Sequence, residues 1–125
     1  MTAKAYLVTG GSGFIGAALT RRLVEDGFRV RVLDDNSRGA PRRLAGIEND
    51  VEFIDGDIRA AETVSLALKG MDGVCHLAFV NGTEFFYSRP ELVLDVGVNG
   101  MNNVIKGCLE HGVGELILAS SSEVY

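Results

Sequence analysis

Four glycines near the start of the chain are the residues best suited to bind a phosphate group. They are Gly10, Gly11, Gly13 and Gly16. In such a motif one glycine makes a tight turn, one lets the backbone approach a pyrophosphate, and one lets a helix pack closely on a strand. The helix that follows offers N–H groups and the positive end of its dipole to the phosphates. The spacing, G-x-G-x-x-G or G-x-x-G-x-x-G, therefore predicts a dinucleotide-binding turn.

An acidic residue lies where a dinucleotide site needs one. A strand pattern over residues 28–33 ends in Asp34, roughly 20 residues past the glycines. A carboxylate there can accept hydrogen bonds from both ribose hydroxyls of an adenosine, and it would repel a 2′-phosphate. The pattern therefore favours NAD over NADP. Arg38 is the counter-argument, because an arginine at that point could pair with such a phosphate.

The elements that must position these groups alternate between strands and helices. Strands are expected at residues 4–9, 28–33, 51–54, 73–77 and 116–119. Helices are expected at 14–26, 60–69 and 91–111, with loops over 35–50 (holding a short helix) and 79–87. This alternation predicts an α/β fold, a Rossmann-type doubly wound parallel sheet of order 3-2-1-4-5. The chemistry-bearing residues then meet at the carboxyl edge of the sheet, where such folds bind ligands.

Composition excludes several classes of partner. The 125 residues fit one domain, and a net charge of −5 argues against nucleic acid and anionic membrane as partners. No apolar run reaches the roughly 20 residues that span a bilayer, and no signal peptide is visible at the N-terminus. Cys75 and Cys108 lie far apart in apolar surroundings without metal-ligand spacing. We therefore expect buried free thiols, no metal site and a cytoplasmic location.

Further motifs follow the glycine turn in order: G-D-I-R at 56–59, H-L-A at 76–78 and S-S-S-E-V-Y at 120–125. Together with the turn and Asp34, they make the chain resemble the extended short-chain dehydrogenase/reductase family. It is most similar to the nucleotide-sugar epimerase and dehydratase branch, over essentially its whole length. The resemblance implies NAD as cofactor and a nucleotide sugar as substrate, converted by transient hydride transfer in a homodimeric enzyme.

The resemblance also assigns cofactor contacts to four segments. It implies pyrophosphate contacts from Gly10, Gly13, Phe14, Ile15 and Gly16. It implies that Asp34 binds the adenosine ribose, with Asp35, Asn36, Ser37 and Arg38 in the contact loop. It implies that Asp57 and Ile58 lie beside the adenine, and that Leu77 and Ala78 pass the nicotinamide side. For Asp57 the alternative is a turn former, because D-G-D is a turn-like sequence.

Two catalytic candidates come from the same resemblance. The family carries a serine or threonine four residues before the tyrosine of its V-Y pair, and counting back from Tyr125 gives Ser121. Glu123 matches the acid that serves proton transfer in dehydratase and decarboxylase members. The alternatives are a polar residue at a strand end for Ser121 and a loop carboxylate for Glu123.

The chain departs from the family pattern in three places. Gly97 replaces a helix asparagine that reaches towards the cofactor, and the bulky Phe79 replaces a small residue after the H-L-A motif. No tyrosine has a lysine four residues on, so the family's Tyr-x-x-x-Lys pair is missing. We expect residues 1–125 to be the N-terminal NAD-binding portion of a longer enzyme, truncated before its last strands, without the substrate lobe and inactive alone. The alternative is a non-catalytic dinucleotide-binding or redox-sensing module.

Overall fold

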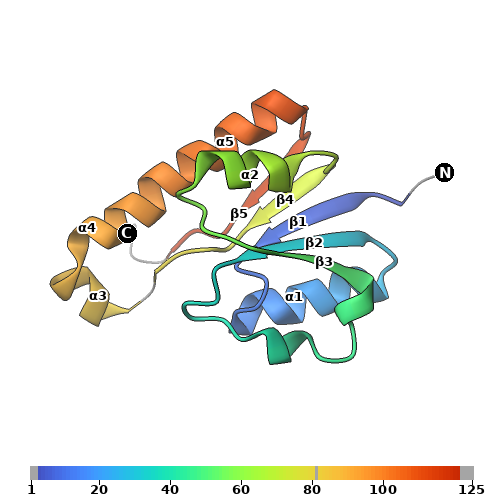
Figure 1. The fold of residues 1–125 in the computed structure, drawn as a ribbon, viewed down its shortest axis with the longest axis horizontal. Helices are drawn as coiled ribbons and strands as arrows, with labels where there is room; N and C mark the ends of the chain where they lie inside the picture. Colours follow the sequence, from blue (N-terminus) through green and yellow to red (C-terminus); the bar gives the residue numbers. More distant parts are fainter. Residues whose placement is uncertain (1–2, 81, 122–125) are drawn as a thin grey trace.

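The computed structural model describes residues 3–80 and 82–121, which form a parallel sheet with helices on both faces (Figure 1). The strands are β1 (Ala5–Thr9), β2 (Arg29–Asp34), β3 (Val51–Asp55), β4 (Gly73–His76) and β5 (Glu115–Leu118). Their order is β3-β2-β1-β4-β5, and all four neighbouring pairs are parallel. The structure thus confirms the predicted fold class and strand order.

Helices connect the strands and cover the sheet. They are α1 (Phe14–Glu25), α2 (Ala61–Leu68), α3 (Thr83–Ser88), α4 (Pro90–Leu94) and α5 (Gly100–His111), with a π turn over Asp95–Asn99 and 3₁₀ turns over Pro41–Leu44 and Glu48–Asp50. Helix α1 lies on one face of the sheet, while α2 and α5 lie side by side on the other (Figure 1). The result is a three-layer α/β architecture.

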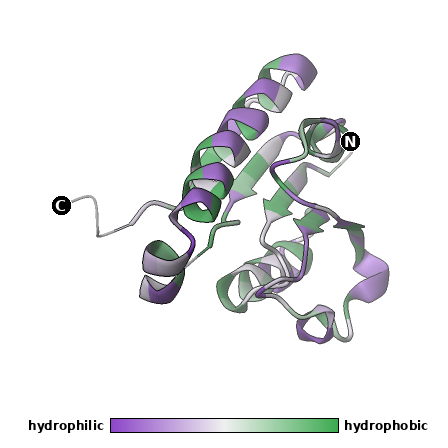
Figure 2. Cartoon of the chain, turned by 60° about the vertical axis from the view of Figure 1, so that its left-hand side comes forward, coloured by the Kyte–Doolittle hydropathy of each residue, from purple (hydrophilic) through white to green (hydrophobic). Residues whose placement is uncertain are grey.

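The core divides into two clusters because successive residues of a strand point to opposite faces. Leu7 of β1 and Val74 of β4 pack with Leu68 on the side of α2 and α5. Val8 and Val32 pack with other buried residues on the side of α1. Figure 2 shows the strands mostly in the hydrophobic colour and the long α5 with mixed faces. Burial on both faces explains why β1 and β4, at the centre of the sheet, read as apolar runs.

Two segments differ from the sequence-based expectation. Residues 83–88 form the short helix α3, although a loop was expected over 79–87. The expected single helix over 91–111 begins at Pro90 and passes through the π turn before α5. Proline suits the first helical position because its N–H would have no partner there anyway. The π turn adds a residue to one helical turn, a change that leaves little trace in apolar periodicity.

Strand β5 lies at the edge of the sheet, and all four of its residues are exposed. Cys75 is a buried free thiol as expected, whereas Cys108 is only half-buried. Burial raises the pKa of both thiols, which disfavours the reactive thiolate. Among the described residues, no helix has the length and apolar character that a membrane crossing requires.

Candidate cofactor site

The glycine turn follows β1 at the centre of the sheet, where the strand order reverses. Gly10 has φ +75°, a backbone conformation that residues with a side chain rarely adopt. Its N–H donates a hydrogen bond to the Leu33 carbonyl oxygen at 2.8 Å. A Cβ at Gly16 would overlap the Gly10 carbonyl oxygen, which is backbone and cannot swing away. A Cβ at Gly13 would lie 3.2 Å from the same oxygen. The turn therefore needs glycine for close backbone packing, as its spacing predicts.

The start of α1 is open towards the ligand edge. Gly13 is the N-cap, no side chain caps the first turn, and no acidic residue lies in that turn. The first N–H groups of a helix have no partner within the helix, so they remain available to an anion. Phe14 is 84% exposed and Ile15 is 71% exposed, so both present apolar surface beside these N–H groups. The residues present fit a pyrophosphate at these N–H groups, with the exposed side chains of Phe14 and Ile15 beside it.

Asp34 is the last residue of β2, and its carboxylate turns towards the glycine turn. Its Oδ2 accepts hydrogen bonds from the backbone N–H of Ser12 at 3.0 Å and from the Ser12 hydroxyl at 2.7 Å. Its Oδ1 accepts one from the backbone N–H of Asn36 at 2.9 Å. The predicted ribose acid is therefore held beside the predicted pyrophosphate turn. Ser12, which is fully buried, was not among the predicted site residues.

The loop after Asp34 is stabilised by local side-chain contacts. Asn36 has φ 61° and is the one non-glycine residue with positive φ in the part of the chain that the structure describes. The Asp35 carboxylate accepts a hydrogen bond from the backbone N–H of Ser37 at 2.9 Å. The Arg38 guanidinium lies over the Phe85 ring of α3, 5.4 Å from the ring centroid. This cation–π contact joins the loop after β2 to the segment after β4.

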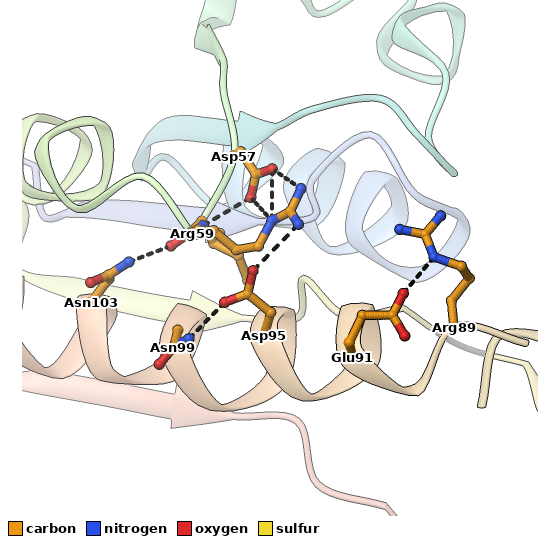
Figure 3. Close-up of polar contacts among 8 residues, drawn as sticks. Asp57, Arg59, Arg89, Glu91, Asp95, Asn99 and Asn103 are labelled. Atoms are coloured by element: carbon orange, nitrogen blue, oxygen red, sulfur yellow. Dashed lines mark hydrogen bonds and ion pairs between the residues drawn. The ribbon is translucent and has the colours of Figure 1, made fainter. Parts of the chain in front are cut away.

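Asp57, just after β3, is engaged by Arg59 (Figure 3). The guanidinium of Arg59 donates to both carboxylate oxygens and also reaches Asp95 in the π turn at 3.5 Å. Hydrogen bonds from Arg59 hold the pKa of the Asp57 carboxyl below its usual range. The Asp57 carboxylate also accepts the backbone N–H of Arg59 at 2.8 Å, so it does form a turn. The structure therefore shows the turn-forming role of Asp57, and its adenine contact stays a prediction.

Ile58 has its side chain in the core rather than at the ligand edge. It is 5% exposed, and a Cβ at Gly100 would lie only 2.6 Å from its Cδ1. Asn103 donates its side-chain amide to the Ile58 carbonyl oxygen at 2.9 Å (Figure 3). Contact between Ile58 and a ligand would therefore have to come from its backbone rather than from its side chain. Asn103 anchors the segment after β3 to α5.

A buried threonine holds the segment after β4. The Thr9 hydroxyl oxygen accepts the backbone N–H groups of Leu77 and Ala78, at 3.0 and 3.1 Å. It also lies 2.7 Å from Nδ1 of His76. With both acceptor sites filled, the hydroxyl donates its hydrogen to Nδ1, so the ring is neutral with its hydrogen on Nε2. Burial lowers the pKa of His76, which agrees with a neutral ring.

Phe79 and Gly97, the two positions at which the chain departs from the family pattern, lie in contact with each other. A Cβ at Gly97 would lie 2.9 Å from Cε1 of Phe79, too close for an undisturbed ring. Phe79 is 48% exposed and follows the Leu77–Ala78 segment directly. Glycine in the π turn therefore makes room for the aromatic ring. The sequence showed both departures, but it did not show that they touch.

The catalytic candidates lie at or beyond the end of the described chain. Ser121 is exposed and lies three residues past Leu118, the last residue of β5. Glu123 lies outside the described residues, and nothing in the structure tests its role. The predicted serine is thus at the carboxyl side of β5, the same edge as the glycine turn.

Most of the predicted cofactor residues lie together at one edge of the sheet. The glycine turn follows β1, Asp34 ends β2, and Leu77–Ala78 follow β4, which is the other neighbour of β1. A Cβ at Gly10 would be 3.1 Å from the Ala78 backbone nitrogen, so these two segments touch. Across the described ranges, no group of three or more His, Cys, Asp or Glu side chains could hold a metal ion.

Fold and site together define a dinucleotide-binding Rossmann domain. Residues 6–125 match the model of the NAD dependent epimerase/dehydratase family, and the chain belongs to that family. The family's description names the same cofactor that Asp34 and the glycine turn predict.

Individual relatives cover nearly all of this chain. UDP-glucose 4-epimerase 3 of Oryza sativa subsp. japonica is 30% identical over 95% of this chain and 35% of its own length. Sterol-4-alpha-carboxylate 3-dehydrogenase, decarboxylating, of Mus musculus is 36% identical over 98% of this chain and 31% of its own. The crystal structure of Thermus thermophilus UDP-glucose 4-epimerase in complex with NAD has TM-score 0.86 and 31% identity, over 94% of this chain and 37% of that one. The chain thus spans about a third of the length of these relatives.

Proposed function

We propose that residues 1–125 are the NAD-binding part of an epimerase or dehydratase that acts on a nucleotide sugar. The observation that carries this proposal is the glycine cradle, in which a Cβ at Gly16 would overlap the Gly10 carbonyl oxygen, set beside Asp34. Relatives whose names include a UDP-sugar epimerase and a dTDP-glucose dehydratase support the substrate class. The substrate lobe would lie in chain beyond residue 125, as the partial coverage of the relatives suggests.

In this proposal the chain's own residues bind and orient the cofactor. The N–H groups at the start of α1 hold the pyrophosphate, and Asp34 accepts hydrogen bonds from the adenosine ribose. Leu77 and Ala78 line the nicotinamide side, held in place by Thr9. Bound NAD would supply a reversible hydride acceptor. Ser121 would donate a hydrogen bond to the substrate oxygen that gains charge as its proton leaves.

A second substrate class is favoured by one observation. Phe79 exposes an aromatic ring directly after the predicted nicotinamide-side segment, where the family usually carries a small residue. Of the three relatives described above, the sterol carboxylate dehydrogenase has the highest identity to this chain, 36%. An apolar alcohol such as a sterol is therefore the alternative to the nucleotide sugar. Both proposals share the same cofactor chemistry.

Product analysis of the intact protein that carries this chain separates the two. The protein and NAD are incubated in three separate reactions, with UDP-glucose, with dTDP-glucose and with a 3-hydroxysterol, and the products are identified by NMR spectroscopy. We expect an epimer or a 4-keto-6-deoxy sugar from a nucleotide sugar, with no net NADH formed. Stoichiometric NADH with the sterol alone would favour the dehydrogenase. Absence of NAD binding would contradict both.

A further inference from the structure

Ser12 connects two parts of the cofactor site that the sequence-based predictions treat separately. It lies inside the glycine turn and is fully buried. Its backbone N–H and its hydroxyl both contact Oδ2 of Asp34, at 3.0 and 2.7 Å. Its carbonyl oxygen accepts the backbone N–H of Ala40 at 3.0 Å and Nη1 of Arg43 at 3.2 Å. Every polar group of this serine therefore bonds to the segment of residues 34–43.

The contact with the Ser12 hydroxyl determines which oxygen of the Asp34 carboxylate can accept a hydrogen bond from a ligand. A hydroxyl carries a single hydrogen, and although the Asn36 Oδ1 also lies 2.8 Å away, the charged carboxylate is the stronger acceptor. A carboxylate has about four acceptor sites. Ser12 fills both sites on Oδ2, and the Asn36 N–H fills one on Oδ1. Of the four sites, the one that no donor among the described residues fills is on Oδ1, so we expect it to accept one ribose hydroxyl rather than both.

Close packing around Ser12 leaves the carboxylate little freedom. A Cβ at Gly39 would overlap the Ser12 hydroxyl and would lie 3.1 Å from Oδ2 of Asp34. Residue 39 therefore presses its backbone against the pair, and any side chain there would push them apart. Without the Ser12 hydroxyl, Oδ2 would lose one of its two donors in a half-buried site.

We propose that Ser12 is a positioning residue for NAD. It fixes the Asp34 carboxylate so that Oδ1 faces the adenosine ribose, and it ties the pyrophosphate turn to the ribose-binding loop. The preference for NAD over NADP then depends on Ser12 acting through Asp34. This inference rests on the proposed cofactor function.

Binding constants of Ser12→Ala for NAD and NADP test the proposal, measured by isothermal titration on the intact protein. A hydrogen bond to a charged group is strong enough that we expect NAD to bind roughly tenfold more weakly. The affinity for NADP should change by less than about threefold, so the preference for NAD over NADP becomes smaller. In an Asp34→Ala background, Ser12→Ala should have no further effect on NAD affinity, because the two residues act as one unit.

The matched control is Ser65→Ala. The Ser65 hydroxyl lies 2.9 Å from both the Glu110 carboxylate and the His111 ring, between α2 and α5. Its loss should leave both affinities unchanged. Ser12→Cys, with nearly the same shape and only a weak donor, gives the same readout if the alanine variant does not fold.

Three outcomes separate the roles that Ser12 could have. If the wild-type protein binds NAD and Ser12→Ala binds it equally well, the proposal is wrong while the cofactor function stands. If Ser12→Ala weakens NAD binding equally in the Asp34→Ala background, Ser12 has only a general structural role and the proposal is again wrong. If the wild-type protein does not bind NAD, the proposed function fails first and this inference with it.

Discussion

Thr9→Val tests whether the end of β1 holds the segment after β4. The Thr9 hydroxyl contacts the N–H groups of Leu77 and Ala78 and Nδ1 of His76. Valine has nearly the same shape without the hydroxyl, so the change removes these hydrogen bonds without opening a cavity. The free energy of unfolding should therefore report the bonds themselves.

The structure sets the magnitude of the loss. The Leu77 N–H keeps a second acceptor, the Thr9 carbonyl oxygen at 3.2 Å, so losing its bond to the hydroxyl costs little free energy. The Ala78 N–H and the His76 Nδ1 each lose the partner described above. A buried polar group without a partner costs about 1–3 kcal/mol. Since Ala78 is only half-buried, we expect the free energy of unfolding to fall by about 2–4 kcal/mol in total.

Urea denaturation of the 125-residue chain at pH 7.5 and 25 °C measures this difference. Thr20→Val is the matched control, because the Thr20 hydroxyl is fully buried yet has no hydrogen-bond partner among the described residues. Its removal should leave stability unchanged or raise it by up to about 1 kcal/mol. A loss below about 0.5 kcal/mol for Thr9→Val, or one no larger than for Thr20→Val, would refute the reasoning.

Three further predictions concern pH, packing and catalysis. Burial lowers the pKa of His76, so its contribution to stability is complete above the unfolded pKa of about 6.5 and is lost as pH falls through the lowered folded pKa. Urea titrations at pH 7.5 and 5.5 should show this loss in the wild type and a smaller one in His76→Gln. Gly97→Ala should raise the free energy of unfolding by less than the roughly 1 kcal/mol that the better helix propensity of alanine offers, or should lower it, because the new methyl group meets the Phe79 ring. In a Phe79→Ala background the same change should raise the free energy of unfolding by that full amount. Equal effects of Gly97→Ala in the two backgrounds would contradict the contact. Ser121→Ala in the intact enzyme should lower kcat by roughly 10- to 1000-fold without changing the Kd for NAD, and an unchanged kcat would remove Ser121 from the mechanism.

The architecture could be predicted because it depends on local patterns. The central strands are apolar runs, three of the four connections between strands carry helical periodicity, and parallel order follows from the alternation. The glycine turn was predictable for the same reason, since its spacing encodes its geometry. Helix α3 was missed because its sequence over 83–88 is rich in aromatic residues, which have no strong helix preference. The π turn at Asp95–Asn99 was missed because one extra residue barely disturbs the helical pattern.

The supporting residues of the site could not be found from the sequence because their partners are distant in the chain. Ser12 contacts a carboxylate 22 residues away, and Thr9 contacts His76, 67 residues away. The predicted role of Ile58 also needed the structure, which places its side chain in the core. A serine inside the glycine turn and a threonine at the end of an apolar strand were the signals available in the sequence. Only the fold shows what each of them holds.

Amide chemical shifts of the ¹⁵N-labelled chain on titration with NAD test the central claim most directly, because they locate the ligand residue by residue. We expect the largest shifts in the glycine turn, residues 10–16, and in the loop after β2, residues 34–38, with smaller ones at Leu77 and Ala78. The amino ends of the strands, such as Arg29 and Val51, should not change. Shifts concentrated at those amino ends, or saturation without any change in residues 10–16, would contradict the assignment of the carboxyl edge as the NAD site.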